Sequence, residues 1–134
     1  MSRRLAPTVT PDTQFFWDGL RKGRLLIQRW VQCGRLRHPP RPMCPSCNSL
    51  DKDAIEASGR GRVYSFVMPQ HPPDPFIEGR YIVALVDLEE GVRIVSNLRD
   101  VDPDKVTIGM AVEVAFETFD GDVVLHQFRP AVVL

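Results

Sequence analysis

The segment from Cys33 to Cys47 restricts the possible folds of this 134-residue chain more than any other feature. Cys44 and Cys47 are spaced as in a zinc knuckle, in which two thiolates converge on one tetrahedral metal ion. A structural zinc site normally takes four ligands from two such knuckles. Here the first knuckle supplies only Cys33, because Trp30 stands where its first cysteine is expected. The pattern predicts a zinc ribbon in which one ligand position is substituted.

The substituted position leaves three alternatives for the metal. The zinc is lost, it is held by three thiolates and a water molecule, or another side chain completes the site. His38 is the nearest substitute in the sequence, because a neutral imidazole binds zinc, but it lies further from Cys33 than knuckle spacing normally allows. Cys33, Cys44 and Cys47 are therefore the candidate metal ligands, and His38 is a weaker candidate.

A ribbon without zinc would be stabilised by packing alone. Trp30, Leu36 and Met43 would supply the contacts, and the thiols would act as small buried hydrophobic groups. A redox-active cysteine pair is disfavoured, since no thioredoxin-like βαβ pattern accompanies the cysteines. Three cysteines, an odd number, also argue against a disulfide framework, and we expect a reducing, cytoplasmic environment.

The residues before the cysteine segment predict one helix. Thr10 suits the N-cap, Pro11 suits the first helical position, and Gly23 suits the end of the helix. A helix so rich in aromatic residues is expected to dock either on the rest of its own chain or on a partner. Its apolar stripe comprises Phe15, Phe16 and Leu20, with Trp17 beside it.

Beyond Asp51 the sequence is typical of β-structure. Short runs rich in Val, Ile, Phe and Tyr alternate with turn signals, and the segment 100–108 is expected to form one helical turn between two strands. Many short strands without alternating helices predict a small closed barrel or a sandwich. The expected strands are 54–58, 61–69, 79–88, 92–98, 111–119 and 123–128, and an earlier strand is expected at 25–31.

Taken together, these motifs resemble a known family over nearly the whole chain: the zinc-ribbon and OB-fold proteins catalogued as domain of unknown function 35. Any one of the motifs alone would be unspecific. The motifs that carry the resemblance are Phe16-Trp17, Gly19-Leu20, Gln28-Arg29 before Cys33-Gly34, Pro39-Pro40-Arg41, Cys44-Pro45-x-Cys47, Gly59-x-Gly61-x-Val63-Tyr64-Ser65-Phe66, Gly109-Met110-x-Val112, Phe116 and Phe128-Arg129-Pro130.

The resemblance implies a mainly β fold in three parts. These are an N-terminal helical arm (1–24), a rubredoxin-like zinc ribbon (25–52) and a C-terminal OB-fold barrel of five strands (53–134). Members of the family accompany thiolase-superfamily enzymes. The run from Leu36 to Cys44 is similar to partners in bacterial steroid side-chain degradation, where such a domain is fused to, or works with, an enoyl-CoA hydratase and supports a thiolase-like aldolase. That aldolase cleaves a β-hydroxyacyl coenzyme A thioester by a retro-aldol step.

The net charge of zero conceals an asymmetry between the two parts of the chain. Residues 1–50 carry +7, and residues 51–134 carry −7. The basic part is expected either to attract a phosphorylated ligand or acidic partner, or to attract the acidic part of the same chain. Arg35, Arg37 and Arg41 lie on a proline-stiffened loop and are candidates for contacts with coenzyme A phosphates or partner carboxylates.

The sequence offers no recognisable catalytic constellation. His71 and Phe76 lie in a proline-rich loop and are candidate ligand or partner contacts, whereas His126 fits a barrel or edge position better than a general base. No nucleophile elbow or phosphate loop occurs. No apolar run reaches the roughly 18 residues needed to span a membrane, and no secretory signal follows the N-terminal arginines.

Two functions follow from these observations. The leading hypothesis is a non-catalytic accessory subunit that forms a hetero-oligomer with a thiolase-like aldolase and helps to form its acyl-CoA channel. The alternative is a nucleic-acid-binding module, since OB barrels bind single strands. The acidic barrel half disfavours this alternative, because nucleic-acid affinity depends on cationic contacts with phosphates.

Overall fold

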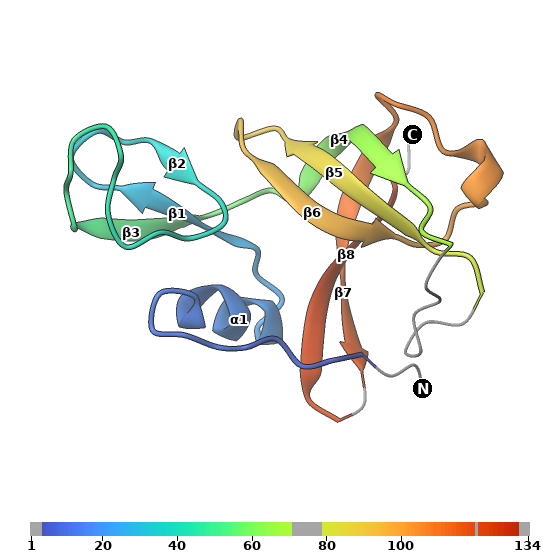
Figure 1. Cartoon of the computed structure of the whole chain (residues 1–134), viewed down its shortest axis with the longest axis horizontal. Helices are drawn as coiled ribbons and strands as arrows, with labels where there is room; N and C mark the ends of the chain where they lie inside the picture. Colours follow the sequence, from blue (N-terminus) through green and yellow to red (C-terminus); the bar gives the residue numbers. More distant parts are fainter. Residues whose placement is uncertain (1–3, 71–78, 120, 132–134) are drawn as a thin grey trace.

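The computed structural model of the chain describes residues 4–70, 79–119 and 121–131. Within these ranges the chain forms one α-helix, a small three-stranded sheet and a closed barrel (Figure 1). The small sheet and the barrel lie at opposite ends of the molecule, and the helix lies beneath the connection between them. The elements are α1 (Gln14–Arg21), β1 (Leu26–Trp30), β2 (Leu36–Arg37), β3 (Lys52–Glu56), β4 (Arg60–Val67), β5 (Ile82–Leu88), β6 (Arg93–Leu98), η1 (Pro103–Lys105), β7 (Ala111–Phe119) and β8 (Val123–Pro130).

The predicted helix forms, but it begins later than the sequence analysis expected. Thr13, not Thr10, is the N-cap residue of α1. The hydroxyl groups of Thr10 and Thr13 lie 3.1 Å apart, and the backbone N–H of Thr10 donates to the Thr13 hydroxyl at 3.0 Å. These bonds hold residues 10–13 in a turn before the helix. Gly23 ends the helix as predicted, with a positive φ of 71°.

The small sheet carries the cysteine loops and has the order β2-β1-β3. Strand β1 is central and pairs antiparallel with both neighbours, so that Arg29 lies opposite Asp53. The Arg29 guanidinium donates two hydrogen bonds to the Asp53 carboxylate, at 2.9 and 2.7 Å. Strand β3 therefore belongs to the ribbon sheet, although the sequence analysis placed residues from 53 onward in the barrel.

The barrel closes in the order β4-β5-β6-β8-β7. Closure depends on the parallel pairing of β6 with β8, at Leu98 and Phe128, and on the antiparallel pairing of β4 with β7. Side chains of β5 alternate strictly between buried and half-buried, as a barrel wall requires. The barrel alternative is thus confirmed over the sandwich, and with it the expected OB fold and the helical turn η1.

One glycine of β4 is needed for the close approach of two barrel strands. A Cβ atom added at Gly61 would lie 2.5 Å from the carbonyl oxygen of Asp87 on β5. This oxygen belongs to the backbone, so it cannot move aside as a flexible side chain would. The Gly59-x-Gly61 motif therefore has a structural role at the start of β4.

A continuous hydrophobic core joins the three parts. Phe16 and Leu20 of α1 and Ile27 of β1 pack in the same cluster as the barrel residues Val86 and Phe128, and each of them is at most 3% exposed. The helix contacts both β8 and β1. Of the two alternatives for its docking, the helix therefore takes the one on its own chain. Among the described residues, the chain has no helix of the length and apolarity that a bilayer crossing requires.

Candidate functional site

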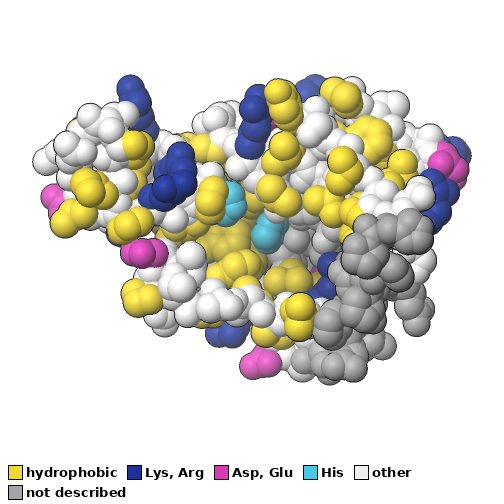
Figure 2. Space-filling view, in the orientation of Figure 1, with side chains coloured by type: hydrophobic (Ala, Val, Ile, Leu, Met, Phe, Trp, Pro, Cys, Tyr) yellow, Lys and Arg dark blue, Asp and Glu magenta, His cyan; other side chains and the backbone are white. Residues whose placement is uncertain are grey.

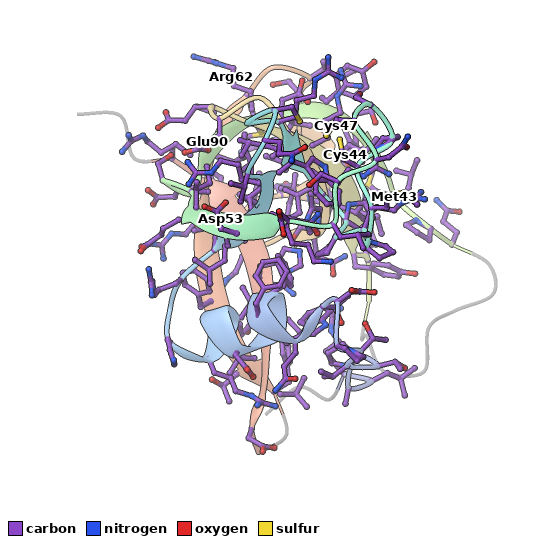
Figure 3. All side chains as sticks on the ribbon, turned by 90° about the vertical axis from the view of Figure 1, so that its left-hand side faces the viewer. Met43, Cys44, Cys47, Asp53, Arg62 and Glu90 are labelled. Carbon is purple, nitrogen blue, oxygen red and sulfur yellow. The ribbon has the colours of Figure 1, made fainter. Side chains whose placement is uncertain are left out.

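The three cysteines meet at the ribbon end of the molecule. The candidate ligand atoms of Cys33, Cys44 and Cys47 all lie within 4.8 Å of one another, and the Cys33 and Cys44 sulfurs are 3.8 Å apart. Figure 3 shows Cys44 and Cys47 close together in this part of the ribbon. Cys44 is 1% exposed, whereas Cys33 and Cys47 are exposed. The sequence prediction that these three residues form one cluster is consistent with this geometry.

The spacing of the sulfurs fits a zinc ion. Zinc binds thiolate sulfur at about 2.3 Å, so two sulfurs of a tetrahedral site lie about 3.8 Å apart. The thiol chemistry fits as well. Burial of Cys44 would by itself raise its pKa, but the backbone N–H groups of Cys47 and Ser46 and the neighbouring thiols outweigh burial and lower the pKa of Cys44 to about 7. The cluster therefore offers three of the four ligands of a tetrahedral site.

The first knuckle keeps its turn even though Trp30 replaces a cysteine. The Trp30 carbonyl accepts a hydrogen bond from Gly34 at 2.7 Å, and its backbone N–H donates to Arg35 at 2.9 Å. The indole is buried at 1% exposure. Met43, by contrast, is 49% exposed, and two of the three thiols face solvent, so the packing-only alternative for the ribbon is wrong in these details.

His38 lies away from the sulfur cluster. It is absent from the group of candidate metal ligands among the described residues, and its ring instead packs against Phe16, with the ring centroids 5.1 Å apart. Burial is the main reason why its pKa falls to about 4, with smaller contributions from His126 and Arg37. His38 is therefore neutral at pH 7 and belongs to the surroundings of the helix.

Residues 35–41, called here the loop of Arg35, Arg37 and Arg41, are fixed to the ribbon sheet by a buried glutamine, and Arg37 lies in strand β2 and not on a loop as expected. Gln28 of β1 is 1% exposed. Its side-chain amide donates to the Arg41 carbonyl and accepts from the Arg41 backbone N–H, both at 2.9 Å. The sequence analysis did not identify this role, because a glutamine in a short strand is normally expected to face the solvent. The exposed Arg35 and Arg41 and the half-buried Arg37 are thus attached to an ordered backbone.

Among the described residues, no carboxylate pairs with these three arginines. Arg35 donates instead to the Ser46 hydroxyl, at 2.6 Å. Other cations of the basic part do pair with acids of the acidic part, as Arg24 does with Glu56 at 2.9 Å. Part of the charge asymmetry is therefore neutralised within the chain, as one of the two alternatives expected.

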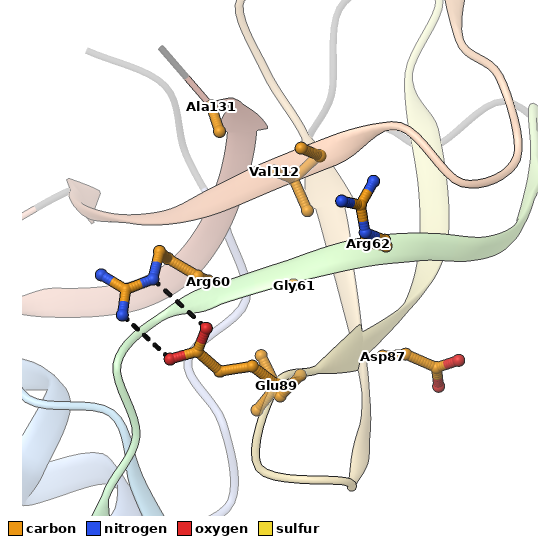
Figure 4. Close-up of a pocket in the computed structure, with 9 residues that line it drawn as sticks. Arg60, Gly61, Arg62, Asp87, Glu89, Val112 and Ala131 are labelled. Atoms are coloured by element: carbon orange, nitrogen blue, oxygen red, sulfur yellow. Dashed lines mark hydrogen bonds and ion pairs between the residues drawn. The ribbon is translucent and has the colours of Figure 1, made fainter. Parts of the chain in front are cut away.

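A second candidate region is a cleft where β4, β5 and β7 meet (Figure 4). Arg60 lies there, but its guanidinium makes two hydrogen bonds with the Glu89 carboxylate, at 3.0 and 3.3 Å. Arg62 donates to the Gly109 carbonyl at 3.0 Å. The cleft thus satisfies its cations internally and is a poorer anion site than the loop of Arg35, Arg37 and Arg41.

The remaining candidates are distributed as follows. His71 and Phe76 lie outside the described residues. His126 lies on β8, as expected of a barrel residue, and its Nε2 is 3.0 Å from the Val95 carbonyl oxygen. Burial lowers its pKa.

Comparisons with family models match both halves of the fold. Residues 17–53 match the model described as "ChsH2, rubredoxin-like zinc ribbon domain". Residues 54–117 match the model described as "ChsH2, C-terminal OB-fold domain".

Two curated relatives are longer proteins. The "Probable enoyl-CoA hydratase alpha subunit" of Thermomonospora curvata is 46% identical over 129 residues, covering 96% of this chain. The "3-oxo-4,17-pregnadiene-20-carboxyl-CoA hydratase alpha subunit" of Mycobacterium tuberculosis is 41% identical over 126 residues, covering 94% of this chain. The chain spans 40% of the length of each of these relatives.

A solved structure is similar over almost its full length. It is described as "Ltp2-ChsH2(DUF35) aldolase", and the matching chain is 47% identical with a TM-score of 0.90. The match covers 94% of this chain and 99% of that one.

Proposed function

We propose that this chain, which belongs to the DUF35 family of zinc-ribbon and OB-fold proteins, is a non-catalytic accessory subunit of a thiolase-like aldolase that acts on acyl-CoA. The observation that carries the proposal is the match, at a TM-score of 0.90 and 47% identity, to a chain of the Ltp2-ChsH2(DUF35) aldolase. The names of the two curated relatives support the coenzyme A thioester as the substrate of the complex. The name of the mycobacterial relative supports a steroid side chain as the acyl group.

The reacting groups are assigned to the partner. A retro-aldol step needs a base of suitable pKa and a donor that stabilises the enolate oxygen. His38 and His126 are unsuited to the role of that base, because burial lowers the pKa of both imidazoles and because His126 is already bonded to the Val95 carbonyl. The hydratase named in the curated relatives is proposed as a second enzyme that shares this accessory domain.

The loop of Arg35, Arg37 and Arg41 is proposed to bind the coenzyme A phosphates or carboxylates of the partner at the mouth of the acyl-CoA channel. Arginine suits both anions, because its planar guanidinium forms paired, charge-assisted hydrogen bonds. The Gln28 bonds to the Arg41 backbone lower the entropic cost of ordering this loop at an interface.

Zinc is proposed as the resident metal of the ribbon, held by Cys33, Cys44 and Cys47. The fourth ligand would be water or a group from the partner, since the described residues bring no fourth candidate side chain into the cluster. A zinc ion in such a site supplies folding free energy to the loops that it joins. The absence of a disulfide among these three cysteines also supports the proposal of a reducing, cytoplasmic location.

The proposal is tested by producing a thiolase-like aldolase with and without this chain. We expect the aldolase to be less soluble alone and to cleave a β-hydroxyacyl-CoA only slowly. Replacing Arg35, Arg37 and Arg41 together by alanine is expected to weaken the assembly or raise the KM about tenfold. The matched control is Arg80→Ala, which removes a cation that is paired with Asp104 at 2.8 Å on the barrel. An aldolase that is fully active without the chain would contradict the proposal.

The nucleic-acid alternative would use exposed aromatic side chains of the barrel. Tyr64 is 45% exposed, but Arg93 covers its ring at 3.5 Å from the centroid. Arg93 is itself paired with Asp87 at 2.6 Å. One ring face and one cation of this barrel wall are therefore already engaged, which favours the accessory function.

A further inference from the structure

A pocket of about 400 Å³ lies between the helix, the 38–40 loop and the barrel. Figure 2 shows the two described histidine side chains in this hollow, surrounded by hydrophobic side chains. Its lining is mainly apolar and includes Phe16, Pro39, Leu85 and Val95. The volume is within the range of small-molecule sites, roughly 300–1,000 Å³, and such sites are common where structural units meet.

Three residues that line the pocket carry buried polar atoms without hydrogen-bond partners in the described part of the chain. Trp17 Nε1, His38 Nδ1 and His126 Nδ1 are shielded from solvent, and none of them has a hydrogen-bond partner among the described residues. All three residues line this pocket. Buried polar groups are nearly always hydrogen-bonded in folded proteins, because an unpaired group loses its hydration without compensation. Three such atoms around one cavity therefore indicate a ligand that supplies the missing partners.

The hydrogen-bonding roles of two of these atoms are fixed by chemistry. An indole Nε1–H can only donate. His126 Nε2 is 3.0 Å from the Val95 carbonyl oxygen, which can only accept, so Nε2 carries the proton and Nδ1 is an acceptor. The ligand must therefore accept a hydrogen bond from Trp17 and donate one to His126.

The pocket also selects against charge. Burial lowers the pKa of His38 and His126, so both imidazoles are neutral at pH 7. Arg93 at the rim is engaged by Asp87 at 2.6 Å and by the Tyr64 ring. No carboxylate is among the lining residues that the structure describes. A cationic group would find no carboxylate among these residues, an anionic group would have to compete with Asp87 for Arg93, and desolvation would oppose the binding of either.

We propose that this pocket binds an uncharged, mainly apolar alcohol, whose oxygen functions accept from Trp17 Nε1 and donate to His126 Nδ1. The site is distinct from the cysteine cluster, and none of Arg35, Arg37 and Arg41 is among its lining residues, although His38, Pro39 and Pro40 of the same loop are. The proposal does not depend on the proposed accessory function, since the helix, the loop and the barrel of this chain alone form the pocket.

The test is an NMR titration of the isotope-labelled chain with decahydro-2-naphthol, a bicyclic alcohol. The matched probe is its O-methyl ether, which has the same apolar body and an acceptor but no donor. We expect both probes to shift the Trp17 indole N–H signal, and only the alcohol to shift the His126 Nδ1 signal. The alcohol should bind about five- to tenfold more tightly, as one additional buried hydrogen bond implies.

His126→Phe provides the matched variant, because a phenyl ring preserves the edge-on contact with Phe16 but has no acceptor. This variant should bind the alcohol and the ether with about equal affinity, and its affinity for the ether should equal that of the wild type. An amide spectrum that is native outside the pocket shows that the variant folds. The proposal is refuted if wild type binds both probes equally, if the shifts map elsewhere, or if neither probe binds.

Discussion

His38 makes a specific prediction about acid stability. Burial, and to a lesser degree His126 and Arg37, lower its pKa from 6.5 to about 4 in the folded chain. The unfolded chain therefore binds a proton on His38 at a higher pH than the folded chain does. The contribution to stability is complete above pH 6.5 and is lost as the pH falls from 6.5 towards 4.

The size of the loss at pH 5 follows from these two values. At that pH the unfolded imidazole is almost fully protonated, and the folded one is almost fully neutral. One pKa unit corresponds to about 1.36 kcal/mol, and pH 5 lies about 1.5 units below the pKa of His38 in the unfolded chain. Protonation of His38 alone should therefore lower the unfolding free energy at pH 5 by about 2 kcal/mol. His126 acts in the same direction, because burial lowers its pKa too.

The assay is urea unfolding at pH 7 and pH 5, followed by circular dichroism, for wild type and His38→Gln. Glutamine is neutral at both pH values, and the carboxylates that titrate nearby are common to both proteins. We expect wild type to lose about 2 kcal/mol more than the variant between the two pH values. Equal losses would refute the reasoning, because they would mean that the folded chain protonates His38 as readily as the unfolded chain does.

Three further predictions concern the loop, the barrel and the metal. The Gln28→Leu variant should lose both hydrogen bonds to the Arg41 backbone, which should lower the unfolding free energy by about 1–3 kcal/mol. Amide hydrogen exchange around residue 41 should become faster. An unchanged exchange rate would count against the role of Gln28. Gly61→Ala should cost about 2 kcal/mol or more by urea unfolding, because its Cβ would meet the Asp87 carbonyl, and a neutral effect would show that β4 can shift. The purified chain should contain one zinc ion per molecule by elemental analysis. The Cys44→Ser variant should lose this zinc, and the His38→Gln variant should keep it. Loss of zinc from the His38→Gln variant would place His38 at the metal site.

Most of the barrel could be predicted from the sequence, because its strands have a strong local signal. The run 111–119 forms β7 with those bounds, and the run 123–128 lies within β8. Alternating burial along a strand leaves a period of two in the sequence, and Gly-containing turns mark its ends. The cysteine spacing likewise indicated the ribbon, because the two knuckle turns are local structures.

The features that were missed depend on contacts between distant segments. Strand β2 has only two residues, Leu36 and Arg37, which is too short for a periodic signal. The start of α1 was misplaced because Thr10 and Thr13 bond to each other. The burial of Gln28 depends on a loop 13 residues away. The pocket of Trp17, His38 and His126 joins three segments that are far apart in the chain, so no sequence window contains it.

The central claim is that this chain is one subunit of an enzyme complex, and native mass spectrometry of the chain purified gently from its own cells tests it most directly. We predict a complex in which a thiolase-superfamily chain is present in stoichiometric amount and separates only on activation. A chain that appears alone, or that carries nucleic acid in place of a protein subunit, would contradict the account.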